Sequence, residues 1–384
     1  MYATKPLSAF AGHTEAASRL PPPPPDGGYS GYLVVKSDEQ GTDETRCWGL
    51  RSQPRVRGLP FPQNRVITVS DPALGEYADA YADAVVFVPV PGVPPSSNRY
   101  YAVLAAGKHR GLVRACSRED DVLATGCFCR CVRDAKPRPF DPADVYQQME
   151  IVPNKGGFTA RSVAADGIPY FLYRSKRWLA YASRPKHFDD LGEALGLNDP
   201  LRSRSLTTPP ATSPASAVAV VGRWYTPFFY IKEDGIPLKT QMDRSTFYEI
   251  VLEQRWEEAI GGAATASKRV LVGGIVEGKQ EAVTTAASAR TGGGGDGYVW
   301  FSAAPWTAGQ RVGVHASLWE KMLWEEQKGG WVADEEVDGC GVRKRMAGGG
   351  GAGSRSVLVE RFAVKRLDGG VVVAFDFSHV NKIN

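Results

Sequence analysis

Three short segments carry residue types that often do chemistry, and the first is Cys127-Phe128-Cys129-Arg130-Cys131. On a β-strand its three thiols would share one face, about 6.5–7 Å apart. That spacing is wider than the separation of thiolates around one zinc ion, and free cysteines are among the most buried residues. We expect small core residues here, with a thiolate metal or redox site as the alternative.

The second segment is Gly107-Lys108-His109-Arg110-Gly111, which sets two cations and an imidazole between glycines. It lacks the Gly-x4-Gly-Lys-Ser/Thr spacing that wraps phosphates. We therefore predict an exposed basic hairpin tip. Lys108, His109 and Arg110 are our candidate contact for an anionic ligand or a partner.

The third segment is Asp376-Phe377-Ser378-His379. Strand alternation would place Asp376 and Ser378 on one face and His379 on the other, whereas a catalytic triad needs the three to converge. The sequence also contains no His-Glu-x-x-His, Cys-x-x-Cys or Gly-x-Ser-x-Gly motif. We accordingly predict no metal and no cofactor, leave the catalytic residues unknown, and lean against an enzyme.

A fourth pattern interleaves Arg174, Lys176 and Arg177 with the aromatic residues Tyr170, Phe171, Tyr173 and Trp178. Such interleaving can stack single-stranded nucleic acid. It also describes a strand with one solvated and one buried face, which is the interpretation we favour.

The elements that would position these groups are mostly short strands. β-branched and aromatic runs bounded by turn residues predict strands at residues 32–36, 65–69, 85–90, 99–104, 270–276 and 298–302. A terminal hairpin is predicted from residues 357–365 and 371–377, joined at Asp368-Gly369-Gly370.

Helices are predicted in four places. Asp141–Met149 has an Asp-Pro start, and Phe188–Leu197 runs from aspartates to a glycine. Thr246 and Glu249 form a capping box before a stripe at i, i+4 spacing, which predicts a helix to residue 260. A second capping box predicts a helix that begins at Ser317 and ends at Gly329-Gly330.

Residues 199–217 are rich in Ser, Thr, Pro and Ala, which predicts a linker. We expect an N-terminal β-rich half at residues 1–198 and a C-terminal α+β half at residues 218–384. Because strands and helices do not alternate, the predicted class is α+β, with largely antiparallel sheets and a few short helices.

The composition of the chain limits where in the cell we expect the protein and which classes of partner we expect it to bind. The chain has 384 residues, of which 43% are hydrophobic and 23% charged, close to the globular average. A net charge of +4 is too small for a dedicated nucleic-acid binder, and no run of about 18 apolar residues occurs. Met1–Leu20 lacks the apolar core of a secretory signal. We expect a soluble, cytoplasmic or nuclear protein that has no membrane partner.

Several peptides resemble a plant family whose members carry the domain of unknown function numbered twelve sixty-two. The resemblance lies in Met1-Tyr2 with Pro6-Leu7-Ser8, and in residues 59–64, 96–101, 107–111, 136–139, 252–257 and 359–362. It spans nearly the whole chain, so it implies a land-plant source and two halves that form one unit. It implies no activity, cofactor or catalytic residue.

We therefore expect an uncharacterised, non-enzymatic binding or interaction protein that serves stress or defence responses, with an unknown protein or small-molecule partner. One alternative is a hydrolase-like enzyme whose site is assembled from distant strands. The other is single-stranded nucleic-acid binding through residues 170–178.

Overall fold

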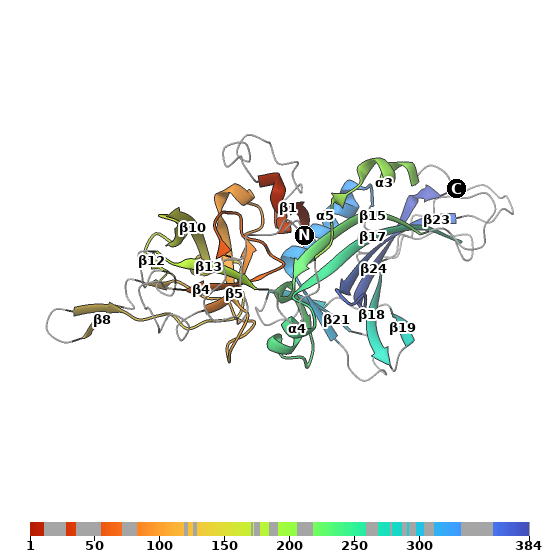
Figure 1. Ribbon diagram of the computed structural model, residues 1–384. Helices are drawn as coiled ribbons and strands as arrows, with labels where there is room; N and C mark the ends of the chain where they lie inside the picture. Colours follow the sequence, from red (N-terminus) through yellow and green to blue (C-terminus); the bar gives the residue numbers. More distant parts are fainter. Residues whose placement is uncertain are drawn as a thin grey trace. The chain divides into compact units, whose positions relative to one another are not determined.

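The computed structural model divides into two compact units (Figure 1). Unit 1 comprises Met1–Ala194, Pro227–Phe229 and Ile236–Thr246, and unit 2 comprises Leu195–Thr226, Tyr230–Gly235 and Phe247–Asn384. Within these units the structure describes residues 1–10, 28–35, 55–70, 83–118, 122–125, 129–169, 172, 177–183, 191–205, 218–258, 268–276, 279–285, 290–291, 297–302, 311–331 and 356–383.

Unit 1 is built on an antiparallel sheet with the strand order β11-β10-β6-β5-β4-β13-β3. Its strands are β3 (Arg55–Val56), β4 (Val66–Ser70), β5 (Asp83–Pro89), β6 (Arg99–Leu104), β10 (Gln148–Asn154), β11 (Gly157–Ser162) and β13 (Leu179–Ser183). The paired strands outside this sheet are β1 (Tyr2–Pro6) with β2 (Gly31–Val35), β7 (Ser117–Arg118) with β12 (Gly167–Ile168), and β8 (Val122–Thr125) with β9 (Cys129–Val132). The helical segments are η1 (Leu7–Phe10), η3 (Pro95–Ser97), η5 (Val145–Gln147) and α4 (Leu238–Arg244).

Aromatic rings fill the core of unit 1. Phe61 stacks on Phe87 at 4.8 Å between ring centroids, and Phe158 meets Phe61 edge-on at 5.0 Å. Trp178 lies 5.3 Å from Phe158 and is 2% exposed. These rings come from segments far apart in sequence, so their contacts hold the sheet together.

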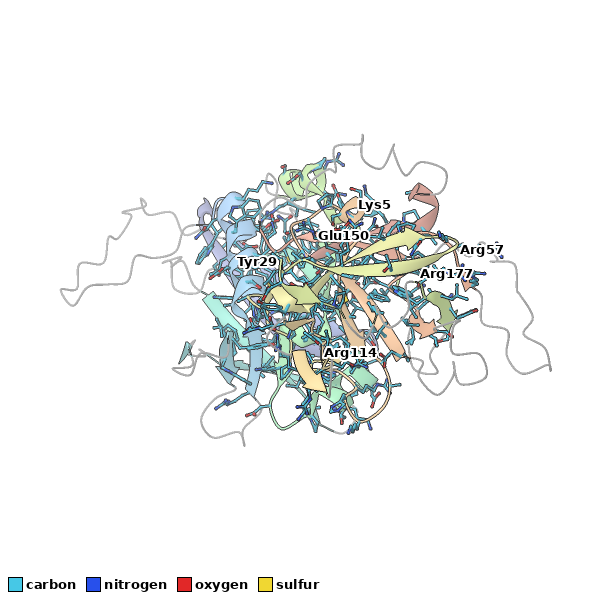
Figure 2. All side chains as sticks on the ribbon, turned by 90° about the vertical axis from the view of Figure 1, so that its left-hand side faces the viewer. Lys5, Tyr29, Arg57, Arg114, Glu150 and Arg177 are labelled. Carbon is cyan, nitrogen blue, oxygen red and sulfur yellow. The ribbon has the colours of Figure 1, made fainter. Side chains whose placement is uncertain are left out.

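Unit 1 also contains a partly buried ion cluster. Arg114, labelled in Figure 2, donates to both carboxylate oxygens of Asp83, at 2.7 and 2.8 Å. A second acid, Asp134, lies 3.4 Å from the same guanidinium. This bidentate geometry is the strong form of an Arg–carboxylate pair.

Unit 2 contains long antiparallel strands in the order β19-β18-β24-β23-β17-β15, with β14 paired to β15 (Figure 1). These strands are β14 (Gly196–Leu197), β15 (Ala219–Pro227), β17 (Phe247–Glu258), β18 (Lys268–Val276), β19 (Lys279–Thr285), β23 (Ser356–Arg366) and β24 (Val371–Ile383). A second sheet has the order β16-β22-β21-β20, from β16 (Ile231–Glu233), β20 (Arg290–Thr291), β21 (Tyr298–Ser302) and β22 (Arg311–His315). The helical segments of unit 2 are α3 (Asp199–Ser205) and α5 (Ala316–Lys328), and η6 (Phe228–Tyr230) has residues in both units.

The described residues thus form mostly antiparallel sheets with few helices, as predicted. The predicted strands at residues 32–36, 65–69, 85–90, 99–104, 270–276 and 298–302 correspond to β2, β4, β5, β6, β18 and β21. The terminal hairpin is confirmed as β23 and β24. The division into halves at residues 198 and 218 remains a prediction.

The helix predicted from Thr246 to residue 260 is wrong, because Phe247–Glu258 is strand β17. Its backbone pairs with β23 over the full length, from Tyr248 opposite Arg366 to Glu258 opposite Ser356. The i, i+4 stripe is also compatible with period two, since every fourth residue of a strand lies on one face. The backbone pairing with β23 along the whole strand outweighs the local preference for a helix that the capping box indicates.

Two other predictions need correction. The predicted helix Asp141–Met149 is reduced to η5, and Gln148–Asn154 is instead strand β10. In the predicted helix Phe188–Leu197, the described residues 191–197 are not helical, and Gly196 has φ 86°. Within the predicted linker, residues 199–205 form helix α3 and residues 206–217 lie outside the described residues, so the linker remains a prediction.

The helix predicted at Ser317 is confirmed as α5, although its cap is His315. The Nδ1 atom of His315 accepts from the backbone N–H of Ser317 at 3.3 Å and lies 2.7 Å from its hydroxyl. The helix ends at Lys328, and Gly329 follows, as the sequence indicates. No helix in the described part of the chain is long and apolar enough to cross a membrane.

Gly157 tests the packing of unit 1. A Cβ atom at Gly157 would lie 2.5 Å from the backbone oxygen of Trp178, whereas one at Gly58 would meet nothing within 4 Å. We expect G157A to lower the free energy of unfolding by about 1–3 kcal/mol, since the clash is with backbone. The matched G58A variant should change it far less. Urea unfolding of both variants measures this, and equal effects would contradict the packing described.

Candidate functional site

The main chemical feature of unit 2 is a set of five polar side chains sealed between helices and sheet. We call it the buried cluster, and its members are Arg202, Gln254, Glu326, Glu360 and His379. Their exposed fractions are 5%, 2%, 0%, 0% and 1% respectively. They come from α3, β17, α5, β23 and β24, so unit 2 must be folded before the cluster exists.

Strand register places three of the five members. Gln254 lies directly opposite Glu360 across β17 and β23, and its Nε2 donates to Glu360 Oε1 at 2.6 Å. On the other side of β23, Glu360 is opposite Phe377, and Leu358 is opposite His379. The imidazole is therefore diagonal to the Glu360 carboxylate, within reach of a long side chain.

Helix α5 positions Glu326. Leu318 and Met322 precede it at i, i+4 spacing and are both buried, so all three lie in one stripe that faces the sheet. After the helix, Trp331 donates its backbone N–H to the carbonyl oxygen of Glu326 at 2.9 Å. Its ring packs edge-on against Phe377 at 5.2 Å. These contacts fix the carboxyl group against β24.

Helix α3 positions Arg202. Asn198 caps this short helix, because its Oδ1 accepts from the backbone N–H of Leu201 at 3.0 Å. The Asn198 carbonyl oxygen accepts from the backbone N–H of Arg202 at 2.9 Å. The guanidinium then extends into the interior of unit 2, where it is 6% exposed.

Arg202 makes the strongest contacts of the cluster. Its Nε donates to Glu360 Oε1 at 2.9 Å, and its Nη2 donates to Glu360 Oε2, so the pair is bidentate. Its Nη1 donates to the backbone oxygen of Glu325 at 3.1 Å, at the helix end where a cation is favoured. The Glu326 carboxyl lies 3.6 Å from Nη2. Arg202 therefore joins α3 to β23 and to α5.

Gly329 makes room for this guanidinium. A Cβ atom at position 329 would lie 2.1 Å from Arg202 Nη2 and 2.6 Å from its Cζ. The backbone of Gly329 has φ −71°, which any residue can adopt, so the absence of a side chain matters here for the space that the guanidinium occupies.

His379 lies between the two acids. Its Nε2 is 3.1 Å from Glu326 Oε2 and 3.1 Å from Glu360 Oε2. Its Nδ1 has no hydrogen-bond partner among the described residues, and neither has Glu326 Oε1. Two carboxyl oxygens around one ring nitrogen need a proton between them.

Burial and charge act differently on the pKa of each group. Burial, followed by repulsion from Glu360, raises the pKa of Glu326 to about 8. Burial would also raise the pKa of Glu360, but hydrogen bonds from His379 and Arg202 outweigh it and bring that pKa below its ordinary range. Burial lowers the pKa of His379, yet hydrogen bonds to Glu326 and Glu360 produce a net rise. The folded cluster thus keeps Glu360 ionised and holds a proton between His379 and Glu326.

Three members of the cluster are close enough together to be considered as metal ligands. One ligand atom each from Glu326, Glu360 and His379 lies within 4.8 Å of the others. Imidazole and carboxylate are zinc ligands. Here, however, both oxygens of Glu360 already accept from the Arg202 guanidinium. A divalent ion would sit beside this fixed cation without further anions to offset it. The cluster fits a proton better than a metal.

The opposite face of the same strands carries a second ion cluster. Asp376 is 2% exposed and accepts from Arg361 at 2.6 and 2.9 Å and from Arg255 at 2.8 Å. Burial would raise the pKa of Asp376, but the two arginines produce a net fall. As strand alternation predicts, Asp376 and His379 contact different partners, so the last strand assembles no catalytic triad.

The structure places the predicted contact residues Lys108, His109 and Arg110 in the turn that follows β6 of unit 1. Lys108 is exposed, and the other two are partly buried. Arg110 forms an ion pair with Asp243 of α4 at 2.5 Å. The basic tip therefore exists as a turn, while its role as a ligand or partner contact remains a prediction.

The other sequence candidates are described only in part. Cys127 lies outside the described residues, as do Tyr170, Phe171, Tyr173, Arg174 and Lys176. Arg177, labelled in Figure 2, donates to the backbone oxygen of Lys155 at 2.8 Å. The neighbouring Trp178 belongs to the core of unit 1. A separate thiol, Cys116, is buried, and burial raises its pKa to about 11.

Sequence reasoning found only one member of the buried cluster, His379, and gave it no partners. Arg202 fell in the predicted linker, and Gln254 in a predicted helix. Two signals were available. Glu326 continues the i, i+4 stripe of Leu318 and Met322, and Glu360 occupies the face shared by Leu358 and Phe362. An acid at a core position needs a buried partner.

Comparison with known proteins gives a family match over part of the chain. Residues 26–128 match the model of a family described as "Protein of unknown function (DUF1262)". No curated protein matches. Among solved structures, the chain is similar to one titled "Crystal structure of Cry35Ab1", with 11% identity, a TM-score of 0.39, and coverage of 84% of this chain and 90% of that chain. That similarity is too weak to establish a shared fold. The match at residues 26–128 thus links the chain to a domain of unknown function.

Two Arg–Glu pairs of unit 2 give a matched test of the cluster. In R202M, Glu360 would stay buried without its main cation, so we expect the free energy of unfolding to fall by about 3–5 kcal/mol. In R223M the lost partner is Glu249, 3.2 Å away, and Arg223 is 48% exposed. That variant should lose at most about 1 kcal/mol. Chemical denaturation of both variants measures the difference, and similar losses would show that the cluster contributes no more than a surface pair.

Proposed function

We propose that the chain is a non-enzymatic binding or interaction protein of α+β architecture. The observation that supports this most is the way the buried cluster satisfies its own charges. Arg202 neutralises Glu360 through a bidentate pair, and His379 shares a proton with Glu326. These groups have the residue types of a catalytic site but are committed to one another.

The acids and the imidazole of the buried cluster also lack access to solvent, which supports a non-enzymatic role. A general acid or base has to reach the atom whose proton it moves, either directly or through one water. The side chains of Glu326 and His379 are 0% exposed, and that of Glu360 is 1% exposed. A hydrolase built on His379 would need that ring and an acid to line a pocket open to substrate. The sealed positions favour a role in stability instead.

For the binding surface we propose the turn after β6. Lys108 and His109 lie at its tip, while Arg110 is held by Asp243. Of these side chains, that of Lys108 is the most exposed. A partner with acidic groups would suit this turn, because exposed cations steer such partners toward contact.

The biological setting rests on the family alone. The peptides that resemble a plant family are our reason for inferring a land-plant source, while the match at residues 26–128 supports a domain of unknown function. Stress or defence is our hypothesis for such a protein, and we place it in the cytoplasm or the nucleus. The partner is an unknown protein or small molecule.

A direct test is turnover of chromogenic carboxyl esters, phosphate esters and glycosides by the full-length chain. We expect no turnover above a heat-denatured control, because the acids and imidazole of the cluster cannot meet a substrate. Turnover by the wild-type chain that disappears in a folded E326Q variant would contradict the proposal and assign catalysis to the cluster.

The turn is tested with heparin as a polyanionic probe. We expect the variant K108A/H109A to elute from immobilised heparin at lower salt than wild type, because it removes the exposed cation Lys108 and the neighbouring imidazole. The control is K136A, which removes another exposed cation of unit 1. If K136A lowers the elution salt as much as K108A/H109A, the turn is no special contact.

A further inference from the structure

The buried cluster joins helix α5 to the sheet through two titratable side chains, Glu326 and His379. Glu326 is on α5, while Glu360 and His379 are on β23 and β24. The contact of His379 Nε2 with both carboxyl groups, at 3.1 Å each, is a direct polar link between this helix and the sheet. Removal of the proton from that contact would leave two carboxylates facing each other in a sealed interior.

We propose that the buried cluster is a proton-dependent latch that holds the C-terminal turns of α5 against β23 and β24 and loosens as the pH rises. With the proton in place, Arg202 offsets Glu360, and the His379–Glu326 contact is neutral as a pair. Without it, Glu326 carries a charge that no further cation offsets, and α5 is the element able to move it into water.

Each element that packs around the contact of His379 with Glu326 and Glu360 contributes a charged or polar side chain. Helix α3 supplies Arg202, and β17 supplies the uncharged Gln254. Helix α5 also carries Lys321 and Glu325, which pair with each other at 3.0 Å. Among the described residues, the cations near the contact are thus Arg202, committed to Glu360, and Lys321, committed to Glu325.

The sign of the pH effect follows from the direction of the pKa changes. His379 and Glu326 both have a pKa above the ordinary values of 6.5 and 4.5, and that of Glu326 reaches about 8. When the latch opens, both pKa values return toward their ordinary values, and the one proton shared by His379 and Glu326 is released. A rise in pH therefore favours the open form, and the effect extends from about pH 6.5, where solvated histidine loses its proton, to about pH 8.

Hydrogen exchange of the full-length chain measures this opening directly. We follow the amides of Ala316–Lys328 by mass spectrometry from pH 6.5 to 8, correcting for the intrinsic pH dependence of exchange. For release of one proton, we expect the opening equilibrium constant of wild type to rise about tenfold per pH unit. Amides of the aromatic core of unit 1 serve as the internal reference, which should show no such slope.

The decisive variant is E326Q, because the amide has the shape of the acid, can accept from His379 through its carbonyl oxygen, and does not titrate. We expect its opening constant to rise less than about threefold over the same range. The matched control is E320Q, which changes an exposed acid of the same helix and should keep the wild-type slope. If E326Q is poorly folded, the wild-type slope itself still decides the question.

Two results would overturn the latch. One is a flat wild-type profile, or an E326Q profile as steep as that of wild type. The other is one equivalent of a divalent metal in purified wild type that E326Q loses, since this would make Glu326 a ligand and replace the proton by a metal ion.

Discussion

The structure of unit 2 depends on one buried ion pair, that of Arg202 with Glu360. A carboxylate without exposed surface is costly unless it is paired and hydrogen-bonded. Here the guanidinium supplies two parallel hydrogen bonds, and Gln254 adds a third. Because the arginine is on a seven-residue helix, α3 must dock before the acid is satisfied. Gly329 must leave the space that the guanidinium fills.

The two faces of β23 and β24 use charge differently. On one face Asp376 is paired with Arg361 and Arg255, of which Arg361 keeps 29% of its side chain exposed. Water can therefore solvate part of that group. On the other face the side chains of Glu326, Glu360 and His379 are closed to solvent. Acids pair with arginine on both faces, and on the closed face these contacts join α3 and α5 to the strands.

The sequence was informative where local patterns decide the structure. The turn at Asp368-Gly369-Gly370 and the helix before Gly329 were predictable from a few neighbouring residues. Strand β17 was not, because its capping box and i, i+4 stripe suit a helix and only its pairing with β23 decides. The buried cluster is harder still. Its members are spread from Arg202 to His379, and no local spacing reveals that β17, β23, β24 and two helices bring them together.

Arg202 and Glu360 should therefore form one energetic unit within a sealed interior. A double-mutant cycle with R202M, E360M and the double variant measures their coupling, using the free energy of unfolding at pH 7. We expect a coupling energy of about 3 kcal/mol or more, with the double variant more stable than R202M alone. If the two losses add to within about 0.5 kcal/mol, Arg202 and Glu360 are not coupled, because independent residues behave in that way.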